Sequence, residues 1–252
     1  MSVLLKLVYC EILKLRRSKI VVFSFLGVSS TPFMMFIDAM QTHLNHPEKI
    51  FTLSDIYDSS LLYVMLLMNF MVYVAITAYL FSREYSENTL KTVLPSPLPR
   101  IRFVLGKYLM LLIWTTVLTV FTWITILLAM FIYNAFFGLA GFSLVIACRW
   151  LVKFMAGSIL LYLTLSPFAY LAEKSKGFVI PVIMSAVVVM GSVAVSNQEI
   201  GALYPWTSGL FIITGKIFDT VYSIQLALGI LASVSFVGFF SSFRYFCLED
   251  LK

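Results

Sequence analysis

Residues 83–107, REYSENTLKTVLPSPLPRIRFVLGK, form the longest densely polar and basic segment of a chain that is otherwise strongly apolar. Uncharged runs flank this segment on both sides, over residues 59–82 before it and residues 108–148 after it. Runs of this length are typical of membrane-spanning helices, which need ~20 apolar residues each. A polar, proline-containing insert between two such helices is expected to lie outside the bilayer, as a surface for a soluble partner.

The composition of the whole chain indicates the same class of protein. Hydrophobic residues make up 61% of the 252 residues and charged residues only 12%, too few to cover the surface of a soluble protein of this size. Because the bilayer core offers no hydrogen-bonding partners, helices are the simplest way to satisfy the backbone there. The sequence therefore predicts an all-α, polytopic membrane protein with a single transmembrane domain over residues 1–252.

The uncharged runs predict six transmembrane helices, and the charge bias sets their orientation. The predicted spans are residues 20–37, 59–82, 108–133, 154–172, 177–197 and 220–243. Lysine and arginine accumulate in cytoplasmic loops, and here they gather in residues 1–19 and 83–107. Both termini are thus expected on the cytoplasmic side of a plasma membrane. The net charge of +6 reflects this orientation, so we expect no nucleic-acid partner.

Two further segments are predicted to lie along the membrane rather than across it. In residues 1–19, apolar side chains recur at helical spacing opposite the lysines, which predicts an amphipathic elbow helix in the cytoplasmic headgroup layer. Residues 200–215 are uncharged, yet at 1.5 Å per residue they would span only ~24 Å of a ~30 Å core. Gly201 and Pro205 interrupt this run, which favours a re-entrant hairpin on the outer face before the last span.

The insert at residues 83–107 has an internal order of its own. Lys91 follows Glu87 at the spacing of one helical turn, which stabilises helices and predicts a short coupling helix to about Leu94. Prolines at 95, 97 and 99 then impose an extended path, because proline fixes its own backbone angle and restricts the residue before it. A short helix tied to two membrane spans can transmit a push from a docked protein into the bilayer.

These residues also carry a resemblance to a known family. Residues 84–90 read EYSENTL, and Pro97, Arg100 and a Leu-Gly-Lys run at 105–107 follow. This pattern is similar to the cytosolic coupling signature of ABC transporter permeases of the type 2 exporter class. Within that class the chain looks most like the bacitracin-resistance and lantibiotic-immunity permeases of Gram-positive bacteria. Asn88 stands where the family usually has glycine, and asparagine tolerates the left-handed turn that glycine allows.

The resemblance implies a set of residues that couple the chain to an ATPase. They are Glu84, Glu87, Asn88, Thr89, Leu90, Lys91, Pro97, Arg100, Gly106 and Lys107. The sequence lacks the phosphate-binding motif GxxxxGK[ST], so we expect ATP and Mg²⁺ on a separate ABC ATPase subunit and no cofactor on this chain. The family works with two permease halves, which implies a second copy of the chain or a related permease. The implied function is export, from the bilayer of a bacterial cell, of an amphipathic or lipid-linked compound such as a peptide antibiotic.

Polar and adaptable side chains in or beside the spans are candidates for a substrate path. They are Asn69, Met65, Met68, Pro167, Tyr204 and Trp206. Asn69 needs a hydrogen-bond partner in a bilayer, methionine adapts to varied apolar shapes, and Pro167 interrupts the fourth span, where it can kink the helix. Packing between helices is the alternative role for the methionines and Asn69, and it is also expected for the threonines of the third span.

Two other classes of function stay open on the sequence alone. A membrane immunity or receptor protein could sequester a toxin through its outer loops without transporting it, although it would not require a coupling segment. An intramembrane enzyme needs catalytic or metal-binding side chains near its spans, but both histidines, His43 and His46, fall in one outer loop. We therefore expect neither an enzyme nor a metal site.

Overall fold

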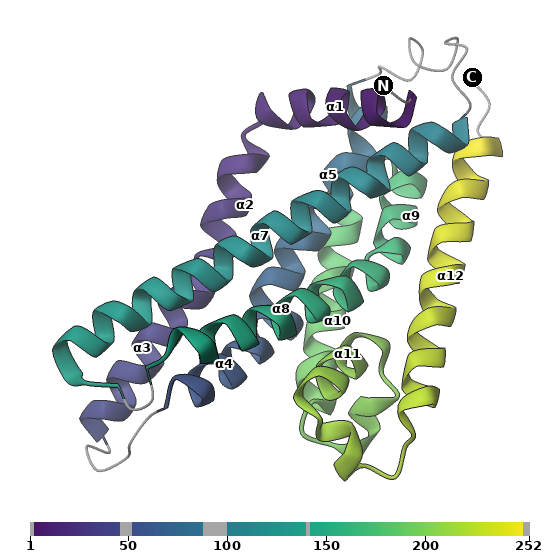
Figure 1. Ribbon diagram of the computed structural model, residues 1–252. Coiled ribbons are helices and arrows are strands. Elements are labelled where there is room, and N and C mark those ends of the chain that lie inside the picture. The colour runs from purple at the N-terminus through teal and green to yellow at the C-terminus, as the bar shows by residue number, and fades with distance from the viewer. Residues whose placement is uncertain (1–2, 46–51, 88–99, 140–141, 249–252) are drawn as a thin grey trace.

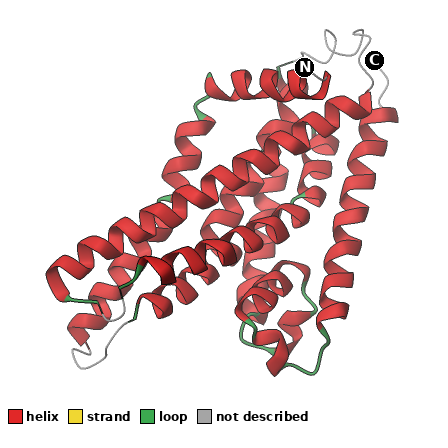
Figure 2. Cartoon of the chain, in the orientation of Figure 1, coloured by secondary structure: helices red, strands yellow, loops and turns green. Residues whose placement is uncertain are grey.

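The computed structural model describes residues 3–45, 52–87, 100–139 and 142–248, and every element assigned within these ranges is a helix (Figure 2). The first half of the chain contains α1 (Val3–Arg16), α2 (Ile20–Val28), α3 (Ser30–Asn45), α4 (Leu53–Leu62), the π-helical turn η1 (Tyr63–Leu67), α5 (Met68–Ser86) and α7 (Arg100–Phe137). The second half contains α8 (Leu144–Thr164), α9 (Ser166–Ser175), α10 (Val179–Val195), η2 (Glu199–Ala202), α11 (Pro205–Thr214), η3 (Lys216–Asp219) and α12 (Ile224–Leu248). For the described residues, the prediction of an all-α protein is confirmed.

Five helical stretches within the described ranges are long and apolar enough to cross a membrane. They are Ile20–Asn45, Leu53–Ser86, Arg100–Phe137, Leu144–Ser175 and Ile224–Leu248. The remaining apolar helix, Val179–Val195, has 17 residues, or ~26 Å at 1.5 Å per residue, which is shorter than a ~30 Å core. The predicted crossing at residues 177–197 therefore stays a prediction, and with it the topology of six spans.

Several observed helices run further than the predicted spans. Helix α7 ends at Phe137 rather than at 133, and α8 begins at Leu144, well before the predicted start at 154. Helix α5 continues through Ser86, so Glu84 belongs to the helix of the second span instead of opening a separate coupling helix. Hydrophobicity marks the part of a helix that lies in the bilayer, whereas a tilted or protruding helix continues past it.

Several helix ends meet at one end of the bundle, which we call the α1 end (Figure 1). There α1 lies across the first turns of α7, and the end of α5 and the end of α12 lie beside them (Figure 1). The end of α3, the start of α4 and α11 lie at the opposite end (Figure 1). The short helices η2 and α11 occupy the region of the predicted outer hairpin. Which end faces the cytoplasm stays a prediction from the charge bias.

Helix α5 lies at the centre of the bundle. In the most apolar window of its span 61% of the residues are buried, against 28% to 33% in the other four spans. Its side chains Phe70, Tyr73 and Phe81 are at most 1% exposed, and α5 contacts α2, α7, α9 and α10. A helix with neighbours on most of its sides can move only together with them, because the protein interior is close-packed.

The fourth span is broken at Leu165, just before Pro167, as the sequence indicated. In a regular helix the backbone N–H of residue 167 would donate to the carbonyl oxygen of Leu163. Proline has no backbone N–H, so this oxygen lacks its usual donor. Ser235 Oγ in α12 donates to this oxygen at 2.9 Å, and Ser166 Oγ lies 3.1 Å from it. A neighbouring helix that satisfies the freed carbonyl makes such a break stable inside a bilayer.

Glycine at position 238 lets α12 pack directly on this break. A Cβ atom added at Gly238 would lie 2.6 Å from Pro167 N and 2.7 Å from Ser166 C, both of them backbone atoms. At Gly229, in the same helix, an added Cβ would meet nothing within 4 Å. The two positions therefore differ in packing while sharing helix and residue type.

We predict that Gly238→Ala lowers the free energy of unfolding by about 1–3 kcal/mol, because overpacking forces the two backbones apart. Gly229→Ala is the matched control and should leave stability unchanged or raise it by up to ~1 kcal/mol, since alanine favours the helix. Thermal unfolding in detergent measures both variants. Equal unfolding temperatures for the two would contradict the close contact between α12 and the break.

Candidate coupling site

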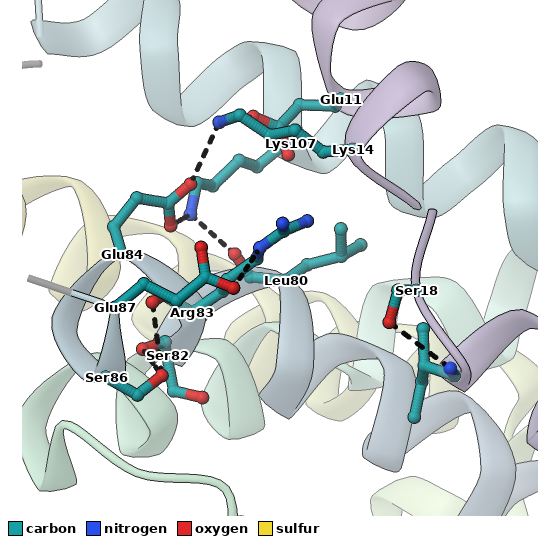
Figure 3. A network of polar contacts seen from close by, with 11 residues as sticks. Glu11, Lys14, Ser18, Leu80, Ser82, Arg83, Glu84, Ser86, Glu87 and Lys107 are labelled. Carbon is teal, nitrogen blue, oxygen red and sulfur yellow. Dashed lines mark hydrogen bonds and ion pairs between the residues drawn. The ribbon is translucent and has the colours of Figure 1, made fainter. Parts of the chain in front are cut away.

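A buried ion pair joins the two helices that flank residues 88–99. The ammonium of Lys107 in α7 donates to Glu84 Oε2 and to the carbonyl oxygen of Leu80, both in α5 (Figure 3). The side chains of Lys107 and Glu84 are only 3% and 2% exposed. Charges removed from water cost several kcal/mol each unless a partner and further hydrogen bonds compensate. The pair therefore favours one relative position of α5 and α7.

Helix α1 adds a second lysine and a second carboxylate. Lys14 Nζ lies 3.4 Å from Glu84 Oε1 and 2.8 Å from Glu11 Oε1 (Figure 3). Partial burial acts to lower the pKa of Lys14, but the carboxylates of Glu11 and Glu84 outweigh it and raise this pKa above its ordinary value. Lys14 is thus held in its charged form. We call the four side chains Glu11, Lys14, Glu84 and Lys107 the charge network; its formal charges cancel.

Aromatic contacts extend the charge network to α12. The ring centroid of Phe103 lies 5.2 Å from Lys107 Nζ and 6.0 Å from Lys14 Nζ, distances at which a cation is attracted to a ring face. On α12, Phe246 stacks on Phe103 with 5.5 Å between the ring centroids. The guanidinium of Arg100 donates to the carbonyl oxygen of Cys247 at 2.9 Å. Four helices, α1, α5, α7 and α12, are therefore joined at the α1 end.

The glycine of the Leu-Gly-Lys run allows α1 and α7 to approach closely. A Cβ atom added at Gly106 would lie 3.3 Å from the Cβ atom of Leu7, which is tighter than an ordinary contact. The next residue, Lys107, carries the buried ammonium. A larger side chain at position 106 would push α1 outward and so lengthen the contact between Lys14 and Glu84.

A second ion pair lies on the surface, at the point where α5 ends. Arg83 Nε donates to Glu87 Oε1 at 2.9 Å, and the Glu87 side chain is 48% exposed. Exposed pairs of this kind contribute only ~0–1 kcal/mol to stability. Glu87 pairs here with Arg83, and its predicted partner Lys91 lies outside the described residues. Its exposed carboxylate remains available to a docked protein.

Asn69, a candidate for the substrate path, lies in a buried polar cluster between three helices. Its Oδ1 accepts from Thr31 Oγ1 of α3 at 2.9 Å, and its Nδ2 donates to Thr122 Oγ1 of α7 at 2.8 Å. Tyr73 and Thr119 form a further contact of 2.7 Å between α5 and α7. In the described structure these groups bond to one another, which is the packing role that the sequence left as an alternative.

The other candidates for the path also make packing contacts. Met65 is 1% exposed and packs into a notch left by Gly157 of α8 and Gly209 of α11. Tyr204 donates to the carbonyl oxygen of Val188, and its ring lies 5.2 Å from that of Trp206. The side chain of Met68 is half-buried, and Pro167 lies at the break in the fourth span. A role for any of them in a substrate path stays a prediction.

Comparison with known proteins assigns the family. Residues 7–192 match the family model described as ABC-2 family transporter protein. The chain belongs to this family. It is also 31% identical over 216 residues to the bacitracin transport permease protein BCRB of Bacillus licheniformis, an alignment that covers 84% of this chain and 100% of that protein. The region matched by the family model contains all four members of the charge network.

The structure of this ABC-2 permease shows where five of the ten predicted coupling residues lie. Glu84 and Lys107 are buried against each other, so neither offers a surface to a docked protein; burial of their charges is stabilised by the contact with α1. Gly106 faces α1, and Arg100 reaches α12. The predicted residues Asn88, Thr89, Leu90, Lys91 and Pro97 lie outside the described residues. For all ten, the role in coupling stays a prediction.

Sequence reasoning missed Glu11 and assigned Lys14 only to the polar face of the elbow helix. A signal was present, since Glu11 is the only acidic residue among the cations of residues 1–19. An acid there at helical spacing from Lys14 indicates a local pair. The contact between Lys14 and Glu84 joins residues far apart in the chain, and no local pattern indicates it.

We predict that Glu84→Gln and Lys107→Met each lower the free energy of unfolding of the permease by about 3–5 kcal/mol, because each removes the closest partner of a buried charge. The double variant should lose clearly less than the sum of the two. Glu87→Gln, which removes one charge of the exposed pair, is the matched control and should cost at most ~1 kcal/mol. Thermal unfolding in detergent provides the four values. Additive losses would show that the buried pair is not coupled.

Proposed function

We propose that this permease is the membrane subunit of an ATP-driven exporter, and that residues 83–107 receive the motion of a separate ABC ATPase. The observation that carries the proposal is the charge network, which ties together both helices that flank residues 88–99. Membership in the ABC-2 family supports the same assignment. ATP and Mg²⁺ would be bound by the ATPase, because the sequence of this chain has no GxxxxGK[ST] motif.

The network explains how a local push could reach several helices. Residues 88–99 follow α5, which carries Glu84, and precede α7, which carries Lys107. These two side chains are paired. Lys14 adds α1 to the pair, and Arg100 adds α12 through the Cys247 carbonyl. A displacement of residues 88–99 would therefore move the four helices together. Closely packed interfaces respond in this all-or-none manner rather than by continuous deformation.

An exporter of this kind alternates between two conformations. ATP binding would bring two ATPase subunits together, and differential contacts with residues 83–107 would shift the permease between its inward-open and outward-open states. A second copy of this chain, or a related permease, would complete the pathway. We place both termini, and with them the α1 end, on the cytoplasmic side of a bacterial plasma membrane, because the cations gather there.

The substrate class follows from the apolar spans and from the relative. Charged residues are absent from the six predicted spans, which argues against an ion or proton pathway. The relative in Bacillus licheniformis is named for bacitracin transport. We propose an amphipathic or lipid-linked compound, with peptide antibiotics as the first to test.

We predict that cells expressing the permease together with its ATPase survive higher concentrations of bacitracin or a related peptide antibiotic than cells lacking both. Substituting the phosphate-binding lysine of the ATPase should abolish the gain, because export needs hydrolysis. The minimum inhibitory concentration measures the effect, and immunoblots control for the amount of permease. Survival that does not depend on ATP hydrolysis would instead indicate sequestration of the toxin and would overturn the export proposal.

We further predict that Glu87→Lys reduces co-purification of the ATPase with the permease, because it reverses an exposed charge at the end of α5, directly before residues 88–99. Glu199→Lys makes the same change at an exposed glutamate in η2, in the region of the predicted outer hairpin, and should leave co-purification unchanged. Equal recovery of the ATPase with both variants would place the docking surface elsewhere.

A further inference from the structure

Two grooves flank the last turns of α12. One lies between α12 and α7, has a volume of about 530 Å³, and is lined by Ile101, Leu105, Phe236, Phe239, Phe240 and Phe243, with Arg244 and Cys247 at one end. The other lies between α12 and α9, has a volume of about 460 Å³, and is lined by Tyr170, Phe240, Ser241, Arg244, Tyr245 and Leu248. Phe240 and Arg244 belong to both grooves, so these two residues form a ridge between them.

The ridge combines a large apolar surface with a cation. The rings of Phe236 and Phe240 stack with 6.2 Å between their centroids and are 71% and 56% exposed. One turn further along α12, Arg244 is exposed, and its guanidinium forms no hydrogen bond or salt bridge within the described part of the chain. It lies near the α1 end, where α12 terminates at Leu248. An arginine in the last turns of a spanning helix reaches the depth of the lipid headgroups.

We propose that an anionic phospholipid of the bilayer binds against α12, with an acyl chain in the α7–α12 groove and its phosphate on Arg244. The cation of the ridge matches the charge of the phosphate, and the α9–α12 groove beside it, lined by Tyr170, Ser241 and Tyr245, suits the polar headgroup. Guanidinium is well suited to this partner, because its N–H groups form a fork that fits phosphate oxygens. The α7–α12 groove is lined by apolar surface, which suits an acyl chain.

Charge complementarity favours a lipid over a second copy of this chain at the same surface. A protein partner that covered the ridge would bury Arg244, and a buried charge without a partner costs several kcal/mol. Such a partner would need a carboxylate opposite the guanidinium. An anionic lipid already carries the matching charge, and its headgroup remains in contact with water.

Lipid retention by the purified permease, together with its ATPase where the two co-purify, tests the proposal. Native mass spectrometry in mild detergent, after addition of phosphatidylglycerol or phosphatidylcholine, gives the bound fraction of each. We expect the wild-type chain to prefer phosphatidylglycerol, and Arg244→Gln to lose that preference by about fivefold, the factor by which one arginine near an anionic headgroup favours binding. Arg149→Gln, the same change at an exposed arginine of α8, is the matched control and should keep the preference.

A second variant tests the groove itself. Leu105→Trp should fill the α7–α12 groove and lower retention of both lipids, while the preference for phosphatidylglycerol persists in the remaining bound fraction. An equal preference in the wild type and Arg244→Gln would overturn the proposal, as would undiminished retention by Leu105→Trp. A third experiment uses a variant that lacks Cys10 and Cys148, so that Cys247 is its only cysteine. If two copies then form a disulfide through Cys247, and added lipid does not prevent it, the surface belongs to a second copy and the proposal is overturned.

Discussion

A pair of opposite charges held out of water, Glu84 with Lys107, is the interaction on which the α1 end of the permease depends. Neither charge is tolerated alone at such burial, so the two helices that carry them must stay together. Lys14 brings α1 into the same contact, and Phe103 brings in α12 through Phe246. The residues between α5 and α7 are thus anchored at both ends. A membrane protein needs such a fixed base if a soluble partner is to move its spans.

The remainder of the bundle is held by different means. Within the bilayer, hydrophobic burial between helices is weak, because lipid tails are as apolar as leucine, so helix contacts depend on close packing and interhelical hydrogen bonds. Asn69 supplies such bonds to α3 and α7. Gly157 and Gly209 supply close packing around Met65. Charges therefore fix the α1 end of the bundle, whereas small and neutral groups hold the spans together.

The break in the fourth span shows how an irregular backbone is tolerated at membrane depth. Pro167 removes one donor, and Ser235 on another helix replaces it. The proline could be recognised in the sequence, but the serine that compensates for it could not. A hydroxyl in a spanning helix usually bonds to the backbone of its own helix, as Thr119 and Thr122 of α7 do. The Ser235 hydroxyl instead bonds to another helix, because α12 packs against the break.

The sequence alone determined that the protein lies in a bilayer, that it is helical and where most of its spans lie. Hydrophobic runs and charge bias are local properties that the bilayer selects directly. It also indicated that residues 83–107 are the special segment and that Lys107 belongs to it. Only the tertiary structure decided that Lys107 and Glu84 are buried together with a lysine from α1, and that two grooves meet at Arg244. The physical reason is that ion pairs and grooves form between distant parts of the chain, and the energy of a charge depends on what surrounds it rather than on its neighbours in sequence.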